Sequence, residues 1–450
     1  MQQVEKSLLS AEELNLIRKN LTFLPLQKNS SALPFHAFAE NESFIRTPKF
    51  FPLREYNIFI KVSFVPALCM GSPATFTIDT DDKTPLRPLQ AEAAAIILRR
   101  LRKATPQQPR GALLCLPCGY GKTRTAAFVA QQLGVVALVL VANKQLAIQF
   151  ERALHDLSPD IRTAQLPKPT APFPADAHII FTTLQAIHAR RPPPAFLCRI
   201  GLLIVDEAHH LAAPTFCQAM CTLAAARVLA LTATPERPDG KERLVYYLGG
   251  DTAFRAYRPL SNNLSLLVLK YPVPPGFGRI RYSSLVERMQ LIVQLANIPA
   301  RNALLVASIT GLALRQGTEA RAGILVLGKL VAHLHCLAEL CGIVLQNNSR
   351  NIFLTGAESQ EQRDEAAKQP LIFATYDLCK EGLDIPRLDT LILVSPAESL
   401  VQCVGRILRD HAGKQAPLVV DVSDDCAAFR HEVQARRRKF AAIGAHEINE

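Results

Sequence analysis

Short apolar runs alternate with longer stretches that have the periodicity of helices, and this alternation constrains the fold more than any other feature. The runs are rich in Val, Ile, Leu and Ala and rarely contain the alternating polar residues of a strand with one solvated face. Such runs, separated by helix-length segments, are typical of parallel strands covered by helices on both faces. They lie at residues 112–116, 135–141, 178–182, 202–206 and 227–232, and again at 324–327, 351–354, 371–375, 390–394 and 418–422.

The segment 271–278 (YPVPPGFG) interrupts this alternation, because its prolines and glycines break regular structure. We therefore predict an α/β chain with two parallel-sheet lobes, at residues 84–270 and 279–450, joined by a linker at 271–278. Residues 1–83 lack the pattern. Within them, 57–65 alternates apolar and polar positions as a half-buried strand does, which predicts a small accessory domain with some β-structure.

The composition restricts the class of protein. The chain has 51 Lys and Arg against 39 Asp and Glu, a net charge of +12, which favours a polyanionic partner or simply confers solubility. The long apolar run at 303–314 ends at Arg315 and is too short to span a bilayer, and the first residues show no secretory signal. The 11 cysteines form no disulfide framework. We therefore expect an intracellular protein that is not embedded in a membrane.

The first chemical motif is 116–123 (LPCGYGKT), which follows a predicted strand and precedes a helical run. Gly119 and Gly121 allow the backbone to turn so that its N–H groups face phosphate oxygens. Lys122 can reach the β- and γ-phosphates, and the Thr123 hydroxyl can hold Mg²⁺. Leu116 stands where the general P-loop pattern has glycine, so a chance glycine-rich turn is the alternative.

The second motif is 205–209 (VDEAH), at the end of the strand predicted at 202–206. A carboxylate at this edge of a parallel sheet lies beside the P-loop. Asp206 can coordinate Mg²⁺, and Glu207 can orient and deprotonate an attacking water. Alone, the motif could be an acidic turn after a strand. Together with the P-loop, it indicates a nucleoside triphosphatase.

With 231–235 (LTATP) following these two motifs in order, the chain resembles the superfamily 2 DExH helicases and translocases. The resemblance covers about residues 84–425. It continues in 86–90 (LRPLQ), in 374–375 with 381–384, and in 402–409 (QCVGRILR). Residues 87–90 and 116–119 are most similar to the XPB and type III restriction-motor branch, near which the helicases of poxviruses and other large cytoplasmic DNA viruses belong. Tyr120 replaces the small residue usual between the glycines, and 141–146 (VANKQL) replaces a common Pro-Thr pair.

The resemblance implies two tandem RecA-like lobes that use ATP and Mg²⁺ to drive movement along nucleic acid. It implies nucleotide contacts from Arg87, Gln90, Pro117, Cys118, Gly119, Tyr120, Gly121, Lys122, Thr123, Gly382 and Asp384. The implied catalytic residues are Lys122, Asp206, Glu207, His209, Gln402, Arg406 and Arg409, with Thr123 and Asp206 on Mg²⁺. Arginine fingers from a second lobe would complete the γ-phosphate site only on closure, so ATP binding and lobe movement would be one event.

The implied nucleic-acid contacts are Asn143, Thr182, Thr183, Thr355, Gly356 and Thr375. Hydroxyls and backbone amides suit phosphates and carry no base information, which predicts weak sequence preference and strong salt dependence. Each threonine could equally be a turn residue at a strand end. The basic stretch 430–440 (RHEVQARRRKF) predicts a C-terminal helix that either contacts nucleic acid or is simply solvated.

We therefore expect an ATP-dependent helicase or translocase that acts on DNA in transcription, replication or repair, with proteins of those pathways as further partners. Three alternatives stay open: a duplex-DNA motor without strand separation, an RNA helicase, and a non-catalytic nucleic-acid-binding scaffold. If the protein is viral, we expect it in the host cytoplasm and in the virion.

Overall fold

Contacts divide the chain into two compact units, Met1–Tyr257 (unit 1) and Arg258–Glu450 (unit 2). The computed structural model describes residues 1–450 except 24–34, 57, 59–62, 65–66, 78–85, 118, 167–172, 191, 235–240, 258–262, 275–276, 278–281, 283, 316–321, 346–351, 355–359, 382, 384, 398–400, 409–410, 412 and 449–450. Only the backbone is described at residues 63–64, 188, 190, 352–354, 360, 363, 380–381 and 401–402.

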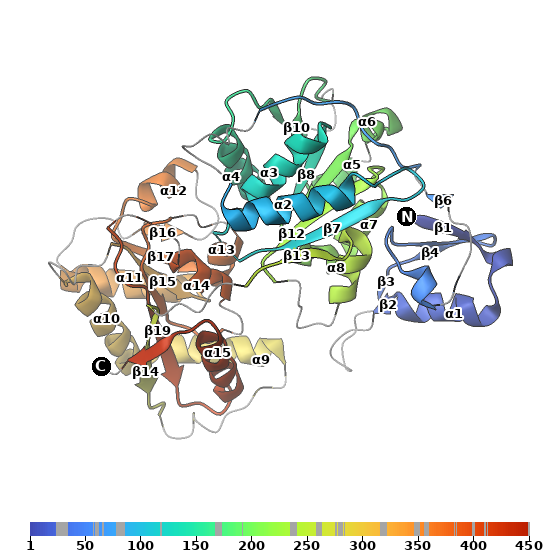
Figure 1. Ribbon diagram of the computed structural model, residues 1–450. Helices are drawn as coiled ribbons and strands as arrows, with labels where there is room; N and C mark the ends of the chain where they lie inside the picture. The colour runs from blue at the N-terminus through green and yellow to red at the C-terminus, as the bar shows by residue number, and fades with distance from the viewer. Residues whose placement is uncertain are drawn as a thin grey trace. The chain divides into compact units, whose positions relative to one another are not determined.

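Unit 1 is built on a seven-stranded sheet in which every pair of neighbouring strands is parallel (Figure 1). The strands, in spatial order, are β13 (Thr252–Arg255), β7 (Arg110–Cys115), β12 (Arg227–Thr232), β11 (Leu202–Val205), β8 (Ala137–Val141), β10 (Ile179–Thr183) and β9 (Thr163–Gln165). All five strands predicted in this half are confirmed to within two residues. β9 and β13 were not predicted, because edge strands are short and less apolar.

Helices cover both faces of this sheet, as the continuous apolar runs predicted. On β7, Ala112 and Leu114 face one buried cluster while Leu113 and Cys115 face the other. The first cluster includes side chains of α2 (Pro88–Leu101), α3 (Lys122–Leu133) and α4 (Lys144–His155). The second includes side chains of α5 (Leu184–Arg190), α6 (Pro194–Arg199), α7 (Pro214–Cys221) and α8 (Glu242–Gly249).

Within unit 1, the N-terminal residues form a small antiparallel sheet that packs against the first lobe. Its order is β4 (Ala39–Glu40), β5 (Phe44–Thr47), β1 (Gln2–Glu5) and β6 (Ser63–Phe64), accompanied by α1 (Ala11–Asn20) and the pair β2 (Thr22–Phe23) and β3 (Phe35–His36). Lys49 is buried and its Nζ donates to Ala225 O at 2.7 Å. Phe51 meets Tyr247 of α8 edge-on. The N-terminal region therefore shares a core with the first lobe. Within the predicted strand at 57–65, β6 is observed and most other residues lie outside the described part.

Unit 2 repeats the architecture with a second seven-stranded parallel sheet (Figure 1). Its order is β16 (Ile352–Leu354), β17 (Leu371–Thr375), β15 (Ile324–Gly328), β18 (Thr390–Leu393), β19 (Leu418–Asp424), β14 (Ser265–Tyr271) and β20 (His446–Ile448). The five predicted strands are again confirmed. β14 pairs with β19 along its whole length, so residues 265–271 belong to this second sheet, ahead of the predicted linker.

Helices also cover both faces of the second sheet. One buried cluster takes side chains from α12 (Gln360–Ala366), α13 (Tyr376–Glu381), α14 (Val401–Ile407) and α15 (Arg430–Ala442), and another takes side chains from α10 (Pro299–Ala313) and α11 (Val331–Leu345). α9 (Leu285–Ala296) packs against Phe429. Among the described helices, none by itself is long and apolar enough to cross a bilayer, and α9 with α10 reaches that length only as a pair bent by 70°.

The basic C-terminal helix differs from its prediction at Arg436. α15 covers the predicted stretch, but Arg436 is 2% exposed, and its Nε donates to Asp421 on β19 at 3.1 Å. Its Nη1 donates to Ala397 O at 3.1 Å. This side chain is therefore part of the core, contrary to both interpretations of the stretch as a surface, because a buried carboxylate requires a buried cation beside it.

Candidate active site

Three motifs predicted from the sequence meet at the carboxyl edge of the unit 1 sheet. The P-loop follows β7, the 231–235 segment ends β12, and Asp206 and Glu207 follow β11. Since β12 lies between β7 and β11 and all three strands are parallel, their carboxyl ends lie side by side. The backbone N–H of Leu116 also donates to Thr232 O at 3.1 Å, which joins the start of the P-loop to β12.

The P-loop backbone turns at two glycines that have positive φ, 83° at Gly119 and 78° at Gly121. This left-handed conformation is accessible to glycine without steric cost, which explains the residue type at both positions. α3 begins at Lys122, so its N-terminal N–H groups and dipole lie at the loop. Lys122 Nζ donates to Leu116 O at 3.2 Å. The sequence pattern did not predict that Leu116 O accepts a hydrogen bond from Lys122. Cys118 lies outside the described residues.

Gln90 at the start of α2 is tied to the P-loop. It is 4% exposed, and its Nε2 donates to Tyr120 O at 3.0 Å. Its Oε1 accepts from the backbone N–H of Arg87 at 2.9 Å. A Cβ at Gly121 would lie 2.1 Å from Gln90 Nε2, so a larger residue there would displace the Gln90 amide from its place against the loop. The Arg87 side chain, by contrast, is exposed.

The acidic motif forms a compact group of charges. Burial, and to a lesser extent neighbouring Glu207, raise the pKa of Asp206 to about 6, although Lys122 and His209 oppose the shift. The Asp206 backbone N–H donates to Leu140 O at 2.9 Å, which fixes the end of β11 against β8. A carboxylate held among other charges in this way suits a divalent cation as its counter-charge.

Glu207 has φ of 47°, the only positive φ of a non-glycine residue in the described chain. A backbone in this region costs on the order of 1–3 kcal/mol and persists where the surroundings impose it, often at functional sites. Glu207 Oε2 lies 3.3 Å from His209 Nδ1, and the His209 and His210 rings are 4.2 Å apart. The strained turn therefore brings the carboxylate and the imidazole of the motif together.

The end of β12 is held by its own threonines. Thr232 is fully buried, and its Oγ1 donates to Thr234 O at 3.1 Å and accepts from Thr234 N–H at 3.2 Å. This local turn follows directly after the last residue of β12. The Thr232 hydroxyl therefore stabilises the backbone turn at the end of β12.

Most of the described residues that were predicted to contact nucleic acid cap helices. The side-chain oxygens of Asn143, Thr183 and Thr375 accept from the backbone N–H three residues later, at 3.0, 3.1 and 3.4 Å. Each stands between a strand and the next helix, at the carboxyl edge of its sheet. Thr182 is only 6% exposed, with its hydroxyl directed at Thr183 O. Thr355 and Gly356 lie outside the described residues.

In unit 2, the predicted residues are described only in part. Arg406 lies on α14 and is half-buried, and its Nε donates to Cys379 O on α13 at 3.1 Å. For Gln402 only the backbone is described. Gly382, Asp384 and Arg409 lie outside the described residues.

Several known proteins are similar to this chain in sequence. Residues 83–237 match the family described as the res subunit of type III restriction enzymes. A candidate ATP-dependent RNA helicase of Acanthamoeba polyphaga mimivirus is 23% identical over 97% of this chain and 83% of its own length. The DNA 3′–5′ translocase XPB2 of Sulfurisphaera tokodaii is 30% identical, over 39% of this chain and 36% of its own.

Among solved structures, the ATP-dependent Type ISP restriction-modification enzyme LlaBIII bound to DNA is similar to this chain. The TM-score is 0.57 with 17% identity, over 82% of this chain and 31% of that enzyme. At this identity the likeness concerns the fold. It agrees with the two parallel-sheet lobes and identifies them as tandem RecA-like domains.

Proposed function

As a superfamily 2 ATPase of the viral helicase and restriction-motor type, this chain couples ATP hydrolysis to movement on nucleic acid, and we propose that its track is DNA. The observation that supports ATP hydrolysis is the convergence of Lys122, Asp206 and Glu207 at one edge of the unit 1 sheet. A phosphate-binding loop and two carboxylates in that arrangement can bind a nucleoside triphosphate and activate water.

In the proposed ATP site, the backbone N–H groups of residues 118–121 and the N-terminus of α3 bind the phosphates. Lys122 leaves its contact with Leu116 O to reach the β- and γ-phosphates. Arg87 and Gln90 lie at the base side of the loop, where Gln90 already holds Tyr120. Donors fixed in place neutralise the phosphate charge without reorganising during the reaction. This electrostatic preorganisation is the largest contribution to rate enhancement in such sites.

The donor set also fits Mg²⁺. Asp206 supplies a carboxylate and Thr123 a hydroxyl, which are hard oxygen ligands of the kind Mg²⁺ prefers. Burial is the main cause of the raised pKa of Asp206, and a cation bound beside the carboxylate would favour its ionised form. Bound with ATP, Mg²⁺ would neutralise charge on the phosphates. Glu207 then orients and deprotonates the attacking water, with His209 Nδ1 holding the carboxylate.

Hydrolysis also involves the second lobe in this proposal. Arg406 and Arg409, with Gln402, are proposed to stabilise the charge that develops on the γ-phosphate, and Gly382 with Asp384 to contact the nucleotide. Arginine fingers act on transition-state charge and contribute about 10³–10⁵ in kcat. Their position on a separate lobe makes nucleotide binding and lobe closure one event.

We propose that the nucleic-acid backbone crosses the helix N-termini capped by Asn143, Thr183 and Thr375, together with Thr182, Thr355 and Gly356. A helix N-terminus attracts phosphate, so the capping role of these side chains is compatible with a phosphate track. Contacts of this kind carry no base information. Binding is therefore expected to be weakly sequence-selective, and the net charge of +12 makes it strongly salt-dependent.

DNA is favoured because the motifs around the P-loop are most similar to the XPB and restriction-motor branch. The mimivirus relative, named for RNA, supports the competing assignment. The protein is proposed to work in transcription, replication or repair and, if it is viral, to occur in the host cytoplasm and in the virion.

The test is ATPase activity with single-stranded DNA, duplex DNA and RNA, followed by strand displacement on the same substrates. We expect DNA to stimulate turnover most. Lys122→Ala and Glu207→Gln should each lower stimulated kcat by about 10²–10⁴, while circular dichroism stays unchanged. Lys103→Ala, outside the site, is the control. Unchanged turnover in both site variants would contradict the assignment, and RNA as the best stimulator would replace DNA.

A further inference from the structure

Two cysteines that take no part in the candidate ATP site lie in contact on unit 1. Cys69 Sγ donates to Cys198 Sγ at 2.6 Å, although the two residues are 129 positions apart in the sequence. Both are free thiols in this structure. Cys198 is exposed in the last turn of α6, and Cys69 is partly exposed. The two sulfurs therefore need to approach only slightly further to form a bond, and a small reagent can reach them from solution.

The backbone around the pair is held by hydrogen bonds on both sides. The N–H of Cys69 donates to Ala224 O at 2.7 Å, and Cys69 O accepts from Ala226 N–H at 2.9 Å. Three residues further on, the N–H of Ser72 donates to Arg199 O at 2.8 Å, directly beside Cys198. The contact between the sulfurs is therefore imposed by the paired backbones that carry them.

Two glycines and one arginine bring the same two segments together. A Cβ at Gly71 would overlap Gly201 Cα, and a Cβ at Gly201 would overlap Met70 O, so this close approach requires glycine at both positions. Arg227 joins the segments, because its Nη1 donates to Met70 O at 3.0 Å and to Gly201 O at 3.4 Å. The chain segment that follows the N-terminal sheet is thus fixed against the segment that follows α6.

The pair lies at the amino edge of the unit 1 sheet. Cys69 forms a parallel bridge with Ala225, just before β12 begins at Arg227. Cys198 lies shortly before β11, which begins at Leu202. The candidate ATP site lies at the opposite, carboxyl edge of these strands. The chemistry of the pair is therefore separate from ATP hydrolysis.

The two thiols differ in access and in acidity. Cys198 is exposed, so it is the thiol that a reagent in solution meets first. Burial, and to a lesser extent the hydrogen bond and the charge of Cys198, raise the pKa of Cys69 to about 11. Once the Cys198 sulfur is bonded to another group, that hydrogen bond and that charge are lost, which makes Cys69 more acidic and a better nucleophile.

We propose that Cys69 and Cys198 form a reversible modification site, which a small-molecule disulfide such as oxidised glutathione converts into a protein disulfide. First, Cys198 Sγ attacks one sulfur of oxidised glutathione, whose S–S bond breaks, and one glutathione leaves with the Cys198 proton. Then Cys69 Sγ attacks Cys198 Sγ, the mixed disulfide breaks, and the second glutathione leaves with the Cys69 proton. Two electrons pass from the protein to glutathione.

The disulfide closes a long loop in unit 1. Because 129 positions separate the two cysteines, the bond strongly restricts the unfolded chain. The folded chain needs little change, since its backbone already holds the sulfurs in contact. We therefore expect the thermal unfolding midpoint of unit 1 to rise by roughly 5–10 °C on oxidation.

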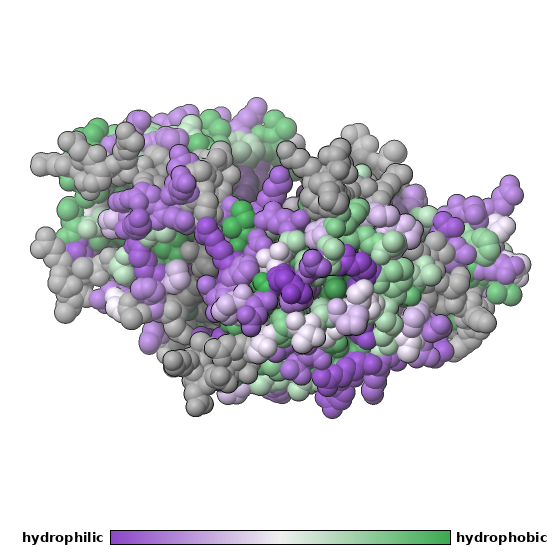
Figure 2. All heavy atoms as spheres, turned by 90° about the horizontal axis from the view of Figure 1, so that it is seen from above, coloured by the Kyte–Doolittle hydropathy of each residue, from purple (hydrophilic) through white to green (hydrophobic). Residues whose placement is uncertain are grey.

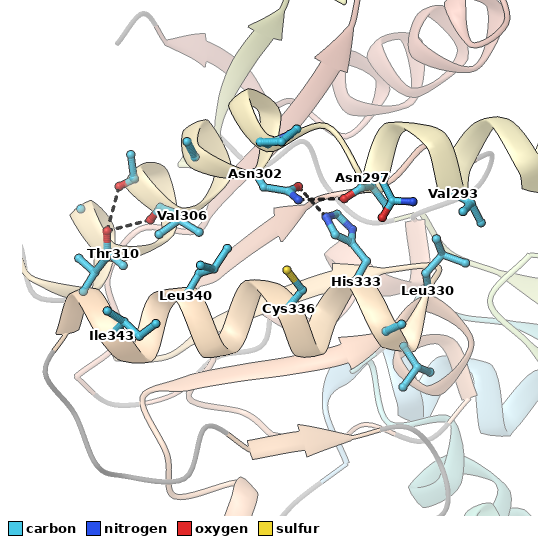
Figure 3. Close-up of a pocket in the computed structure, with 18 of the residues that line it drawn as sticks. Val293, Asn297, Asn302, Val306, Thr310, Leu330, His333, Cys336, Leu340 and Ile343 are labelled. Carbon is cyan, nitrogen blue, oxygen red and sulfur yellow. Dashed lines mark hydrogen bonds between the residues drawn. The ribbon is translucent and has the colours of Figure 1, made fainter.

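Cys336 is the matched control, because it is an exposed cysteine in different surroundings. It lies on α11 and lines the groove beside His333, between α10 and α11 (Figure 3). Among the described residues that line this groove, no other is a cysteine. In Figure 2, apolar residues gather at the left edge, the end at which Figure 1 labels α10 and α11. Any glutathione that Cys336 takes up should therefore remain attached, since no second thiol lines the groove to displace it.

The experiment treats the reduced full-length protein with oxidised glutathione, blocks the remaining thiols with N-ethylmaleimide, and maps peptides without reduction. We expect the peptide that contains Cys69 to be joined to the one that contains Cys198, with the loss of two hydrogen atoms. Dithiothreitol should restore both thiols. Cys69→Ser should stop the reaction at the mixed disulfide, with glutathione retained on Cys198. Cys336→Ser should leave the cross-link unchanged.

Thermal unfolding of the same samples measures the effect of the bond. Oxidation should raise the midpoint in wild type, whereas Cys198→Ser treated in the same way should show no rise. Three results would overturn the proposal. The first is glutathione retained on Cys198 of the wild type, as in Cys69→Ser. The second is Cys198 joined to a cysteine other than Cys69. The third is recovery of both thiols unreacted while Cys336 has taken up glutathione.

Discussion

His333 is a basic side chain that unit 2 holds in its neutral form. Burial, and to a lesser extent the nearby Arg301 guanidinium, lower the pKa of His333 to about 4. Arg301 itself is 1% exposed and is paired with Asp424 at 2.6 Å, so its charge is fixed close to the imidazole. A residue that titrates between folding and unfolding makes stability depend on pH.

We predict that unit 2 loses stability as the pH falls. Unfolded His333 takes up a proton below its ordinary pKa of about 6.5, whereas the folded form resists protonation down to about 4. The folded state is therefore disfavoured progressively between pH 6.5 and 4, by about 1–2 kcal/mol from pH 7 to pH 5. Urea denaturation at both pH values, followed by hydrogen exchange in α10 and α11, measures this.

The control is His335, which is exposed on the same helix. His333→Gln should remove most of the difference between pH 7 and pH 5, and His335→Gln should leave it unchanged. Equal pH dependence in the two variants would show that the acid sensitivity arises elsewhere.

At the scale of elements, α15 shows how one basic helix divides between core and surface. Arg436 pairs with buried Asp421 of β19, while Arg438, two residues further on, is exposed. Burial raises the pKa of Asp421, and Arg436 opposes this effect. Removing one partner of a buried ion pair leaves an uncompensated charge, which costs far more than losing an exposed charge.

We predict that Arg436→Met lowers the free energy of unfolding by about 3–5 kcal/mol. Arg438→Met should change it by less than about 0.5 kcal/mol, because surface charges contribute little. Urea denaturation with hydrogen exchange in β19 measures both. If α15 contacts nucleic acid, only Arg438→Met should reduce the salt dependence of DNA binding, by about one unit of slope at most. Similar unfolding energies for the two variants would contradict the buried pair.

For the whole molecule, the two lobes are expected to act together through Arg406. Its Nε is anchored on Cys379 O, which fixes the guanidinium stem to unit 2. An arginine that stabilises charge only in the transition state should contribute much more to kcat than to the affinity for ATP.

We predict that Arg406→Ala lowers kcat for DNA-stimulated ATP hydrolysis by about 10³-fold or more, while affinity for ATP changes less than about tenfold. Stopped-flow nucleotide binding and steady-state turnover separate the two effects. Arg387→Ala is not a suitable control, because the Arg387 Nε donates a hydrogen bond to Ala367 O and its loss would disturb unit 2. The exposed Arg430 serves instead. A variant with weak ATP binding and normal kcat would exclude the arginine-finger role.

Much of this fold could be predicted because buried parallel strands have a direct sequence signature. All ten predicted strands are observed, since an apolar run with no polar alternation is stable only between two layers of helices. β14 and the N-terminal sheet were harder to assign. Strand pairing is decided by distant partners, and β14 lies between β20 and β19, the latter about 150 residues further along the chain.

The sequence by itself determined the chemistry at the carboxyl edge of the first sheet, because phosphate binding and water activation require particular residue types at fixed local spacing. Only the tertiary structure decided what those and other polar side chains contact. It tied Gln90 to Tyr120, placed Arg436 in the core, and left the groove beside His333 open. Burial and hydrogen-bond partners depend on residues far apart in the chain, which local patterns do not encode.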